Sequence, residues 1–237
     1  MLLYHAIGGS ALAVTCEGFR AQMEWLASCA DILPLDVMLR REGAAPLQVA
    51  ITFDDGYVSL HSEALPVLRG VGARAAAFLN TGWIAETVRK ASSAAQGHYP
   101  DERFLLWREV GDLAAAGWTI GSHGVGHLDL TVQDDERVRH ELSASRQAIA
   151  ARLGACSPVF SYTWGRHNAH LRQLVAQDGY SHAVAGIHAP YSDMSDPLAI
   201  PRINIDRGYT LDDFKAIVAG DWDYLGWWQR LRAGRWN

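Results

Sequence analysis

Two adjacent carboxylates, Asp54 and Asp55, end an apolar run of the sequence and are followed at once by Gly56. Aspartate is a poor strand residue, so two of them at a strand end cost local stability. A sequence that breaks its own local rule in this way often marks a functional site. One carboxylate of such a pair can bind a metal ion while the other handles a proton.

Two histidines, His123 and His127, lie four positions apart in a stretch that also contains Gly121, Gly124 and Gly126. Three glycines disfavour a helix and predict a loop after a strand. Taken alone, the histidine pair is as readily a coincidence as a site. Together with an aspartate at a strand end, two imidazoles suit Zn²⁺, Co²⁺, Fe²⁺, Ni²⁺ or Mn²⁺. Three protein ligands also leave positions open for water and substrate, as in catalytic sites.

The sequences TFDDGY at residues 52–57 and SHGVGH at residues 122–127 carry a family resemblance. Together they resemble the polysaccharide deacetylases with a NodB homology domain, carbohydrate esterase family four. The resemblance extends from about residue 2 to residue 206. It implies a distorted (β/α) barrel of about seven parallel strands and the metal-dependent removal of acetyl groups from N-acetylated sugars.

The resemblance also implies a role for each motif residue. Asp54 matches the general base and Asp55 the metal ligand, with His123 and His127 completing the metal site. The implied cofactor is one divalent ion, for which zinc is favoured and cobalt, nickel, iron or manganese are accepted by the same ligands. Such an ion lowers the pKa of water and polarises the acetyl carbonyl, and the base takes the proton of the water.

The family further uses a histidine as general acid for the leaving amine, usually on a late strand. No segment after Arg202 fits that pattern, whereas the chain opens with the sequence LLYH, which ends at His5. This order resembles the circularly permuted branch that includes deacetylases of poly-N-acetylglucosamine, and it assigns the general acid to His5. The alternative is an ordinary polar residue at the end of the first strand. In a closed barrel the first and last strands are neighbours, so permutation preserves the site.

A third family motif helps to build the oxyanion site, and residues 160–166 match it. Within this segment Tyr162, Trp164 and Gly165 are the candidates for substrate and oxyanion contacts. Thr163 stands where the permuted branch often has proline, so we expect a less rigid loop. The backbone N–H of Trp164 is the candidate oxyanion donor.

The arginine that the third motif usually contains upstream is absent. Arg202 is therefore predicted to orient Asp54 and keep it ionised, with Arg166 as the alternative. A salt bridge between surface loops is an equally open explanation for either arginine.

Aromatic and histidine side chains elsewhere are weaker candidates for sugar contacts. Trp83, His98 and Tyr99 offer faces for sugar stacking, although buried aromatics are commoner. His167 and His170 follow the third motif and are candidates to line the substrate groove.

Short apolar stretches alternate with amphipathic ones along the chain, which predicts an α/β fold with a parallel sheet and helical crossovers. The expected strands are residues 2–5, 32–35, 47–53, 73–79, 118–121, 159–162, 182–186 and 200–205. The expected helices are residues 17–29, 60–71, 107–116, 134–153, 169–177 and 211–218. Residues 90–102 are polar and irregular and are expected to form a surface loop.

The 237 residues show no linker or repeat, so one domain over residues 1–237 is predicted. A net charge of −5 without a basic block argues against a nucleic-acid partner. A Trp-rich helical tail at about residues 210–237 is expected to pack on the barrel. A peripheral membrane contact or an oligomer contact through this tail is the alternative.

The first residues have neither a basic region nor a long apolar region, so we expect no signal peptide. No run approaches the roughly 20 apolar residues of a membrane span. Three cysteines without a paired spacing indicate thiols in a reducing compartment. A cytoplasmic location is therefore expected.

The leading hypothesis is a metal-dependent deacetylase of an N-acetylated sugar or polysaccharide. A deformylase or amidase that acts on a lipid-linked sugar or another small amide is the first alternative, since the same residues would serve. A non-catalytic carbohydrate-binding barrel is the second.

Overall fold

Seven parallel strands form the central sheet of the structure, a computed structural model that describes residues 1–40, 47–191 and 196–223. Along the sheet the strands are β8 (His182–Val184), β7 (Val159–Ser161), β6 (Thr119–Ser122), β5 (Ala76–Leu79), β4 (Ile51–Phe53), β1 (Leu2–Tyr4) and β9 (Ile203–Asn204). Every neighbouring pair is parallel, which confirms the predicted sheet type and the number of strands.

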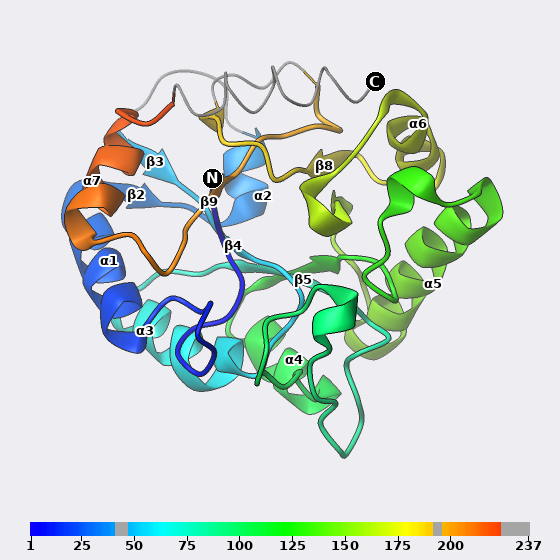
Figure 1. Cartoon of the computed structure of the whole chain (residues 1–237), viewed down its shortest axis with the longest axis horizontal. Coiled ribbons are helices and arrows are strands. Elements are labelled where there is room, and N and C mark those ends of the chain that lie inside the picture. The colour runs from blue at the N-terminus through cyan, green and yellow to red at the C-terminus, as the bar shows by residue number, and fades with distance from the viewer. Residues whose placement is uncertain (41–46, 192–195, 224–237) are drawn as a thin grey trace.

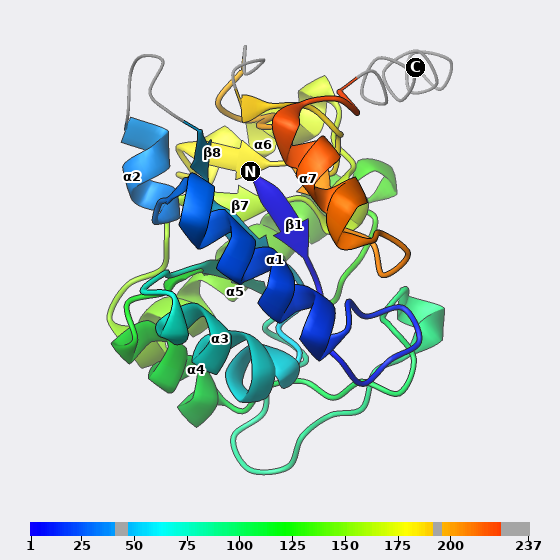
Figure 2. The same ribbon diagram turned by 90° about the vertical axis from the view of Figure 1, so that its left-hand side faces the viewer.

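Helices surround this sheet (Figure 1). They are α1 (Cys16–Cys29), α2 (Leu35–Arg40), α3 (Leu65–Gly70), α4 (Trp107–Ala115), α5 (Asp135–Leu153), α6 (Ala169–Gln177) and α7 (Leu211–Ala219). Figure 2 shows α1 and α7 side by side across the N-terminal strand β1. Crossover helices on the outside are what parallel strands require, since a short hairpin cannot connect them.

A short segment before and within β9 brings the two edges of the sheet together. Ile200 forms a bridge to Val184 in β8, and three residues later Ile203 pairs with Leu2 in β1. The same stretch of chain therefore touches both edge regions and curls the sheet into a barrel. This arrangement confirms the predicted distorted barrel and places β1 between β4 and β9.

The predicted strand over residues 47–53 is in fact two strands. β3 (Gln48–Val49) pairs with β2 (Asp31–Ile32) in a separate two-stranded sheet, whereas β4 pairs with β1. The change of partner occurs at Ala50, whose carbonyl accepts a hydrogen bond of 2.9 Å from the N–H of Leu2. A continuous apolar run indicates that a strand is buried, but it does not indicate which strand is its partner.

Two further expectations hold in part. The predicted strand over residues 32–35 stops at Ile32, and α2 begins at Leu35; its six residues are too few for a helical period to emerge. Residues 90–102 do lie at the surface as expected, although His98 and Glu102 within them are buried.

The start of the predicted C-terminal helix is confirmed by α7, and Trp222 beyond it meets Tyr209 edge-on, with ring centroids 5.3 Å apart. Trp227, Trp228 and Trp236, on which the tail prediction rests, lie outside the described residues. Within the described part of the chain, no helix combines the length and apolar character that crossing a membrane demands.

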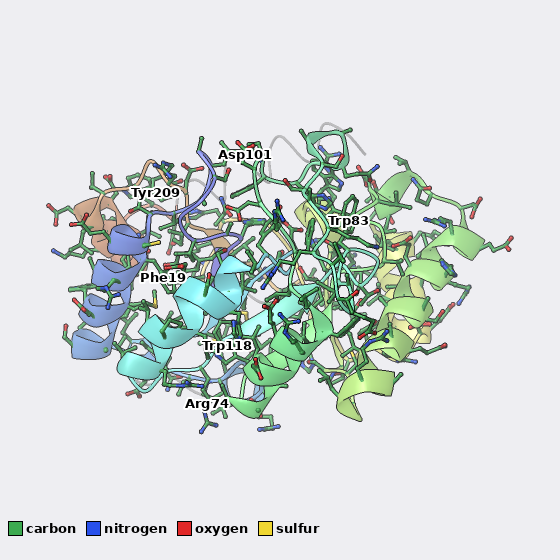
Figure 3. All side chains as sticks on the ribbon, turned by 90° about the horizontal axis from the view of Figure 1, so that it is seen from below. Phe19, Arg74, Trp83, Asp101, Trp118 and Tyr209 are labelled. Carbon is green, nitrogen blue, oxygen red and sulfur yellow. The ribbon has the colours of Figure 1, made fainter. Side chains whose placement is uncertain are left out.

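Phe19 of α1 packs against the sheet (Figure 3). It is fully buried, and its ring centroid lies 5.3 Å from that of Tyr4 and 5.9 Å from that of Phe53. We predict that Phe19→Ala lowers the free energy of unfolding by about 3–5 kcal/mol, because it leaves a cavity between helix and sheet.

Urea denaturation at pH 7 measures this effect. The control is Val88→Ala, since Val88 is 77% exposed and its replacement should change the free energy of unfolding by less than about 0.5 kcal/mol. A Phe19→Ala protein as stable as the Val88→Ala protein would contradict the role of α1 as a barrel wall.

Candidate active site

The candidate residues lie where strands of the sheet end. Asp54 and Asp55 follow β4, His123 and His127 follow β6, and His5 follows β1. The carboxyl ends of parallel strands meet at one face of a barrel, which brings these motifs together from distant parts of the sequence.

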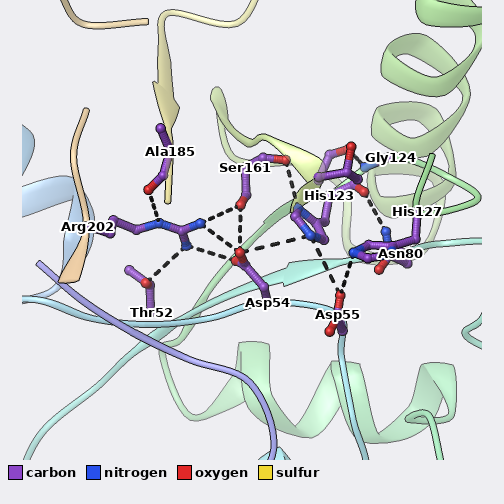
Figure 4. A network of polar contacts seen from close by, with 12 residues as sticks. Thr52, Asp54, Asp55, Asn80, His123, Gly124, His127, Ser161, Ala185 and Arg202 are labelled. Atoms are coloured by element: carbon purple, nitrogen blue, oxygen red, sulfur yellow. Dashed lines mark hydrogen bonds and ion pairs between the residues drawn. The ribbon is translucent and has the colours of Figure 1, made fainter. Parts of the chain in front are cut away.

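Asp55, His123 and His127 form a buried cluster (Figure 4). Asp55 Oδ1 lies 3.6 Å from His123 Nε2 and 3.5 Å from His127 Nε2. The other ring nitrogens lie against carbonyl oxygens: His123 Nδ1 is 2.8 Å from that of Ser161, and His127 Nδ1 is 2.6 Å from that of Gln96. Because a carbonyl only accepts, each Nδ1 carries a hydrogen, and the neutral form of each ring then presents the Nε2 lone pair to the cluster.

Three acceptor atoms therefore converge within 4.8 Å of one another. Asp55 Oδ1 has no hydrogen-bond partner among the described residues, although it is buried. Acceptors repel one another in this arrangement unless a cation lies between them. One carboxylate and two imidazoles fit a divalent transition metal, and they are the residues that the sequence predicts as ligands.

The backbone after β4 explains the order Asp-Asp-Gly. Asp55 and Gly56 both have left-handed conformations, with φ of 70° and 89°. Aspartate tolerates this region better than most residues. A Cβ at Gly56 would lie 2.8 Å from Leu79 Cδ2, so only glycine fits the second position without a shift of its neighbours.

Asp54 lies between the cluster and Arg202: its Oδ2 is 4.0 Å from His123 Nε2, and both of its carboxylate oxygens contact the guanidinium (Figure 4). Arg202 is fully buried and holds the carboxylate with two bonds, Nη1 to Oδ1 at 2.9 Å and Nη2 to Oδ2 at 2.7 Å. Its other donors reach the Ala185 carbonyl, Thr52 Oγ1 and Ser161 Oγ at 3.2, 3.2 and 2.9 Å. All five N–H groups of the guanidinium are thus satisfied, as a buried charge requires.

These contacts determine the charge of Asp54. Burial by itself raises the pKa of this carboxyl, but Arg202, His123 and His5 together hold the pKa well below its usual range. Asp54 is therefore ionised at neutral and mildly acidic pH. Of the two predicted arginines, only Arg202 contacts it; Arg166 lies on the surface and pairs with Asp129 at 2.6 Å.

His5 lies beside the aspartate pair, as the permuted strand order predicts. β1 pairs with β4 through Leu3–Thr52 and Tyr4–Phe53, so His5 follows β1 where Asp54 follows β4. Its ring stacks on Tyr99 with centroids 5.3 Å apart. His5 Nδ1 is buried and has no hydrogen-bond partner among the described residues. Its role as general acid stays a prediction.

The third motif follows β7. The side chain of Tyr162 is buried and its hydroxyl donates to the Leu198 carbonyl at 2.9 Å, which leaves only its backbone for the substrate. Trp164 is left-handed with φ of 59°, and its half-exposed ring lies 5.0 Å from that of His127. Gly165 is also left-handed, and a Cβ there would lie 2.6 Å from Gly186 Cα.

Thr163, which stands in place of the expected proline, has a contact of its own. Its hydroxyl donates to the carbonyl of Leu128, the residue after His127. The third motif is thereby tied to the histidine loop, so the loss of proline is offset by a hydrogen bond.

The predicted sugar-stacking role of His98 is wrong. Its ring is 3% exposed and lies between Trp83, Phe104 and His127, with centroids 4.5, 4.8 and 5.0 Å away. Burial lowers the pKa of His98 to about 4 against the opposing charge of Asp55, so the ring is neutral. Trp83 and Tyr99 are partly buried in the same aromatic group.

The two histidines beyond the third motif line a groove, and their predicted contact with substrate stays a prediction. His167 and His170 border a groove of about 1080 Å³ that runs from Gly165 and Arg166 along the start of α6. Asp129, two residues after His127, forms part of its other wall.

Glu141, on α5, is a functional candidate that the sequence reasoning missed. It is fully buried, and its Oε2 accepts the N–H groups of Val125 and Gly126 at 2.6 and 2.8 Å. The carboxylate thus holds the loop between the two histidines. The signal was available, because Glu141 shares the inner face of the predicted helix with Val138 and Leu142.

Comparison with known families supplies independent information. The family model for polysaccharide deacetylase matches residues 43–183, more than half of the chain. The chain belongs to the polysaccharide deacetylase family. The matched span contains the aspartate pair, both histidines and the third motif, and it leaves out the strand of His5 and the segment of Arg202.

Individual relatives agree with this assignment. YxkH of Bacillus subtilis (strain 168), which carries a provisional polysaccharide deacetylase name, is 26% identical over 224 residues, covering 92% of this chain and 75% of YxkH. Streptococcus pyogenes deacetylase PplD, solved in complex with acetate, superposes with a TM-score of 0.76 at 21% identity, over 92% of this chain and 96% of PplD. IcaB from Ammonifex degensii superposes with a TM-score of 0.77 at 18% identity, over 92% of this chain and 94% of IcaB. These structures share the predicted fold.

The buried pair of Arg202 and Asp54 leads to a stability prediction. Arg202→Met should lower the free energy of unfolding at pH 7 by about 3–5 kcal/mol, because it leaves Asp54 as an unpaired buried charge. The double variant Arg202→Met/Asp54→Asn should recover much of this loss, since no charge remains.

The pH dependence has a defined sign. In the wild-type protein the pKa of Asp54 is lower in the folded state than in the unfolded chain. The ion pair therefore stabilises the fold fully at pH values above the unfolded pKa, and this contribution is lost as pH falls through the folded pKa. In Arg202→Met the folded pKa of Asp54 rises. The loss of unfolding free energy relative to the wild-type protein should therefore shrink as pH falls and the carboxyl becomes neutral. Urea unfolding of the wild-type protein, the single variants Arg202→Met and Asp54→Asn, and the double variant at pH 7 and pH 4.5 tests this. Strictly additive effects would contradict the pairing.

Glu141 leads to a prediction on metal binding. Glu141→Ala should weaken divalent metal affinity about 10–100-fold, because the histidine loop loses its anchor. Glu141→Gln keeps an acceptor and should retain most of the affinity. Competition with a chromophoric chelator measures this, with Glu136→Ala, exposed on the first turn of α5, as the control. Equal affinities for the two alanine variants would exclude the anchoring role.

Proposed function

We propose that this protein is a metal-dependent hydrolase that removes N-acetyl groups from an N-acetylated polysaccharide or sugar. The observation that carries the proposal is the convergence of three lone-pair atoms from Asp55, His123 and His127 beside a second, ionised carboxylate. Membership of the polysaccharide deacetylase family supports deacetylation as the reaction. The similarity to PplD, a deacetylase solved with acetate, supports the same chemistry.

Asp55, His123 and His127 would hold the metal, and zinc is the proposed ion because a carboxylate with two imidazoles leaves room for water and substrate. When bound, a divalent ion lowers the pKa of water and polarises an acyl carbonyl. Asp54 accepts the proton of the attacking water. Its lowered pKa makes Asp54 a weak base, so proton transfer to it depends on a water that is itself acidified.

The remaining steps fall to residues on the neighbouring strands. His5, at the end of β1, donates a proton to the leaving amine nitrogen, which converts a poor leaving group into a neutral amine. The backbone N–H of Trp164 donates to the carbonyl oxygen as negative charge develops there. The left-handed turn at Trp164 and Gly165 fixes the direction of this N–H.

The groove beside the third motif supports an extended substrate. Its volume of about 1080 Å³ exceeds what one sugar ring occupies, and it begins next to Gly165. Thr131, Asn168 and Arg172 contribute donors and acceptors to its walls. This lining suits the hydroxyl groups of sugars that flank the reactive one, which favours a polysaccharide or oligosaccharide over a free monosaccharide.

Metal content and acetate release together test the proposal. Purified protein should contain about one equivalent of divalent metal and release acetate from N-acetylated oligosaccharides. Asp55→Ala, His123→Ala and His127→Ala should each lose the metal. Asp54→Asn should keep the metal and lose at least about 100-fold in turnover, as expected for removal of a general base.

His140→Ala, an exposed replacement on α5, is the control and should match the wild-type protein. Retained turnover by Asp54→Asn would exclude the mechanism. A parallel panel of formylated sugars separates deacetylation from deformylation. Oligosaccharide binding without turnover and without metal would instead indicate a non-catalytic binding barrel.

A further inference from the structure

Four consecutive residues, Gln96–Tyr99, contact every loop that carries a proposed catalytic group. None of them belongs to the motifs that identify the family. The segment begins at the last residue of a short 3₁₀ turn, Ala94–Gln96. The N–H groups of Gln96 and His98 donate hydrogen bonds to the Ser93 carbonyl at 2.9 and 3.2 Å.

The first contact is with the metal ligand His127. The carbonyl of Gln96 accepts the Nδ1 hydrogen of His127 at 2.6 Å, and the ring of His98 lies 5.0 Å from that of His127. The hydrogen bond fixes which ring nitrogen carries the proton, and the ring contact limits rotation of the imidazole. Together they keep Nε2 of His127 directed at the ligand cluster, the kind of support that tunes metal affinity.

The second contact is with the third motif. Gly97 is left-handed with φ of 76° and lies against the ring of Trp164. A Cβ at Gly97 would overlap this ring, with its atoms Cζ2 and Cζ3 only 2.5 and 2.8 Å away. No residue other than glycine leaves room for Trp164 in its present position.

The third contact is with the strand ends of β1 and β4. The N–H of Tyr99 donates to the hydroxyl oxygen of Tyr57 at 2.9 Å. The ring of Tyr99 stacks on those of Tyr57 and His5, with centroids 5.9 and 5.3 Å apart. Tyr99 thereby supports the predicted general acid.

We propose that Gln96–Tyr99 is a positioning clamp that sets the affinity of the metal site and aligns His127, Trp164 and His5 with one another. Its effect on catalysis rests on the proposed function, whereas its effect on metal affinity does not. Because coupling between two sites is reciprocal, a metal ion bound at the cluster also orders the clamp.

Gly97→Ala tests the clamp without touching a metal ligand. The added methyl group displaces the Trp164 ring or the Gln96 carbonyl, so zinc affinity in chelator competition should fall about tenfold or more. The matched control is Gly154→Ala, since Gly154 has a φ of 81° and nothing within 4 Å of an added Cβ. Gly154→Ala has the same backbone strain and should bind zinc like the wild-type protein.

A second variant separates the clamp from general damage to the fold. In Gly97→Ala/Trp164→Ala the overlap is gone, so affinity should return toward that of Trp164→Ala alone. Hydrogen exchange of peptides covering residues 93–104 should slow when zinc is added to the wild-type protein. That zinc effect should be weaker in Gly97→Ala, while the core strands exchange as before.

The clamp proposal is wrong if Gly97→Ala and Gly154→Ala bind zinc with equal affinity. It is also wrong if zinc leaves the hydrogen exchange of residues 93–104 unchanged. A double variant no better than Gly97→Ala would also exclude it. Acetate release reports separately on the proposed function. If the zinc affinity depends on the clamp but the wild-type protein releases no acetate, the proposed function alone is refuted. If the wild-type protein does not bind zinc, both proposals are refuted.

Discussion

The buried pair of Arg202 and Asp54 is the interaction on which the rest of the structure depends. Arg202 belongs to the segment that joins the two edges of the sheet, and Asp54 ends β4. The guanidinium also binds Ser161 at the end of β7 and Thr52 in β4. Closure of the barrel therefore also supplies the charge that keeps the proposed base ionised once it is buried. A charge of this kind is tolerated inside the protein only because every donor and acceptor around it is used.

The sequence predicted the parts of the site that depend on residue type. Asp54, Asp55, His123 and His127 stood out because carboxylates and imidazoles are unusual at the ends of apolar strands. The structure brings Asp55 and the two histidines into one cluster. The sequence could not predict that the Gln96 carbonyl supports His127. Every residue has a carbonyl, and only the path of the chain decides where it points.

Other failures have different causes. The split of residues 47–53 at Ala50 reflects a change of strand partner, which leaves no trace in an apolar run. The preference for Arg202 over Arg166 was correct, but the sequence left both open, because only closure of the sheet brings Arg202 to Asp54. Glu141 was different: its place on the inner face of a predicted helix was visible, and an acidic residue there has to have a partner.

The position of β1 between β4 and β9 in the sheet has a consequence for biosynthesis. β1 is synthesised before its two neighbours β4 and β9, and Arg202 follows Asp54 by 148 residues. Until that stretch emerges, the nascent chain carries an open sheet edge and an uncompensated aspartate. Contacts of such long sequence separation slow folding, so the centre of this barrel can form only after Arg202 and β9 have been synthesised.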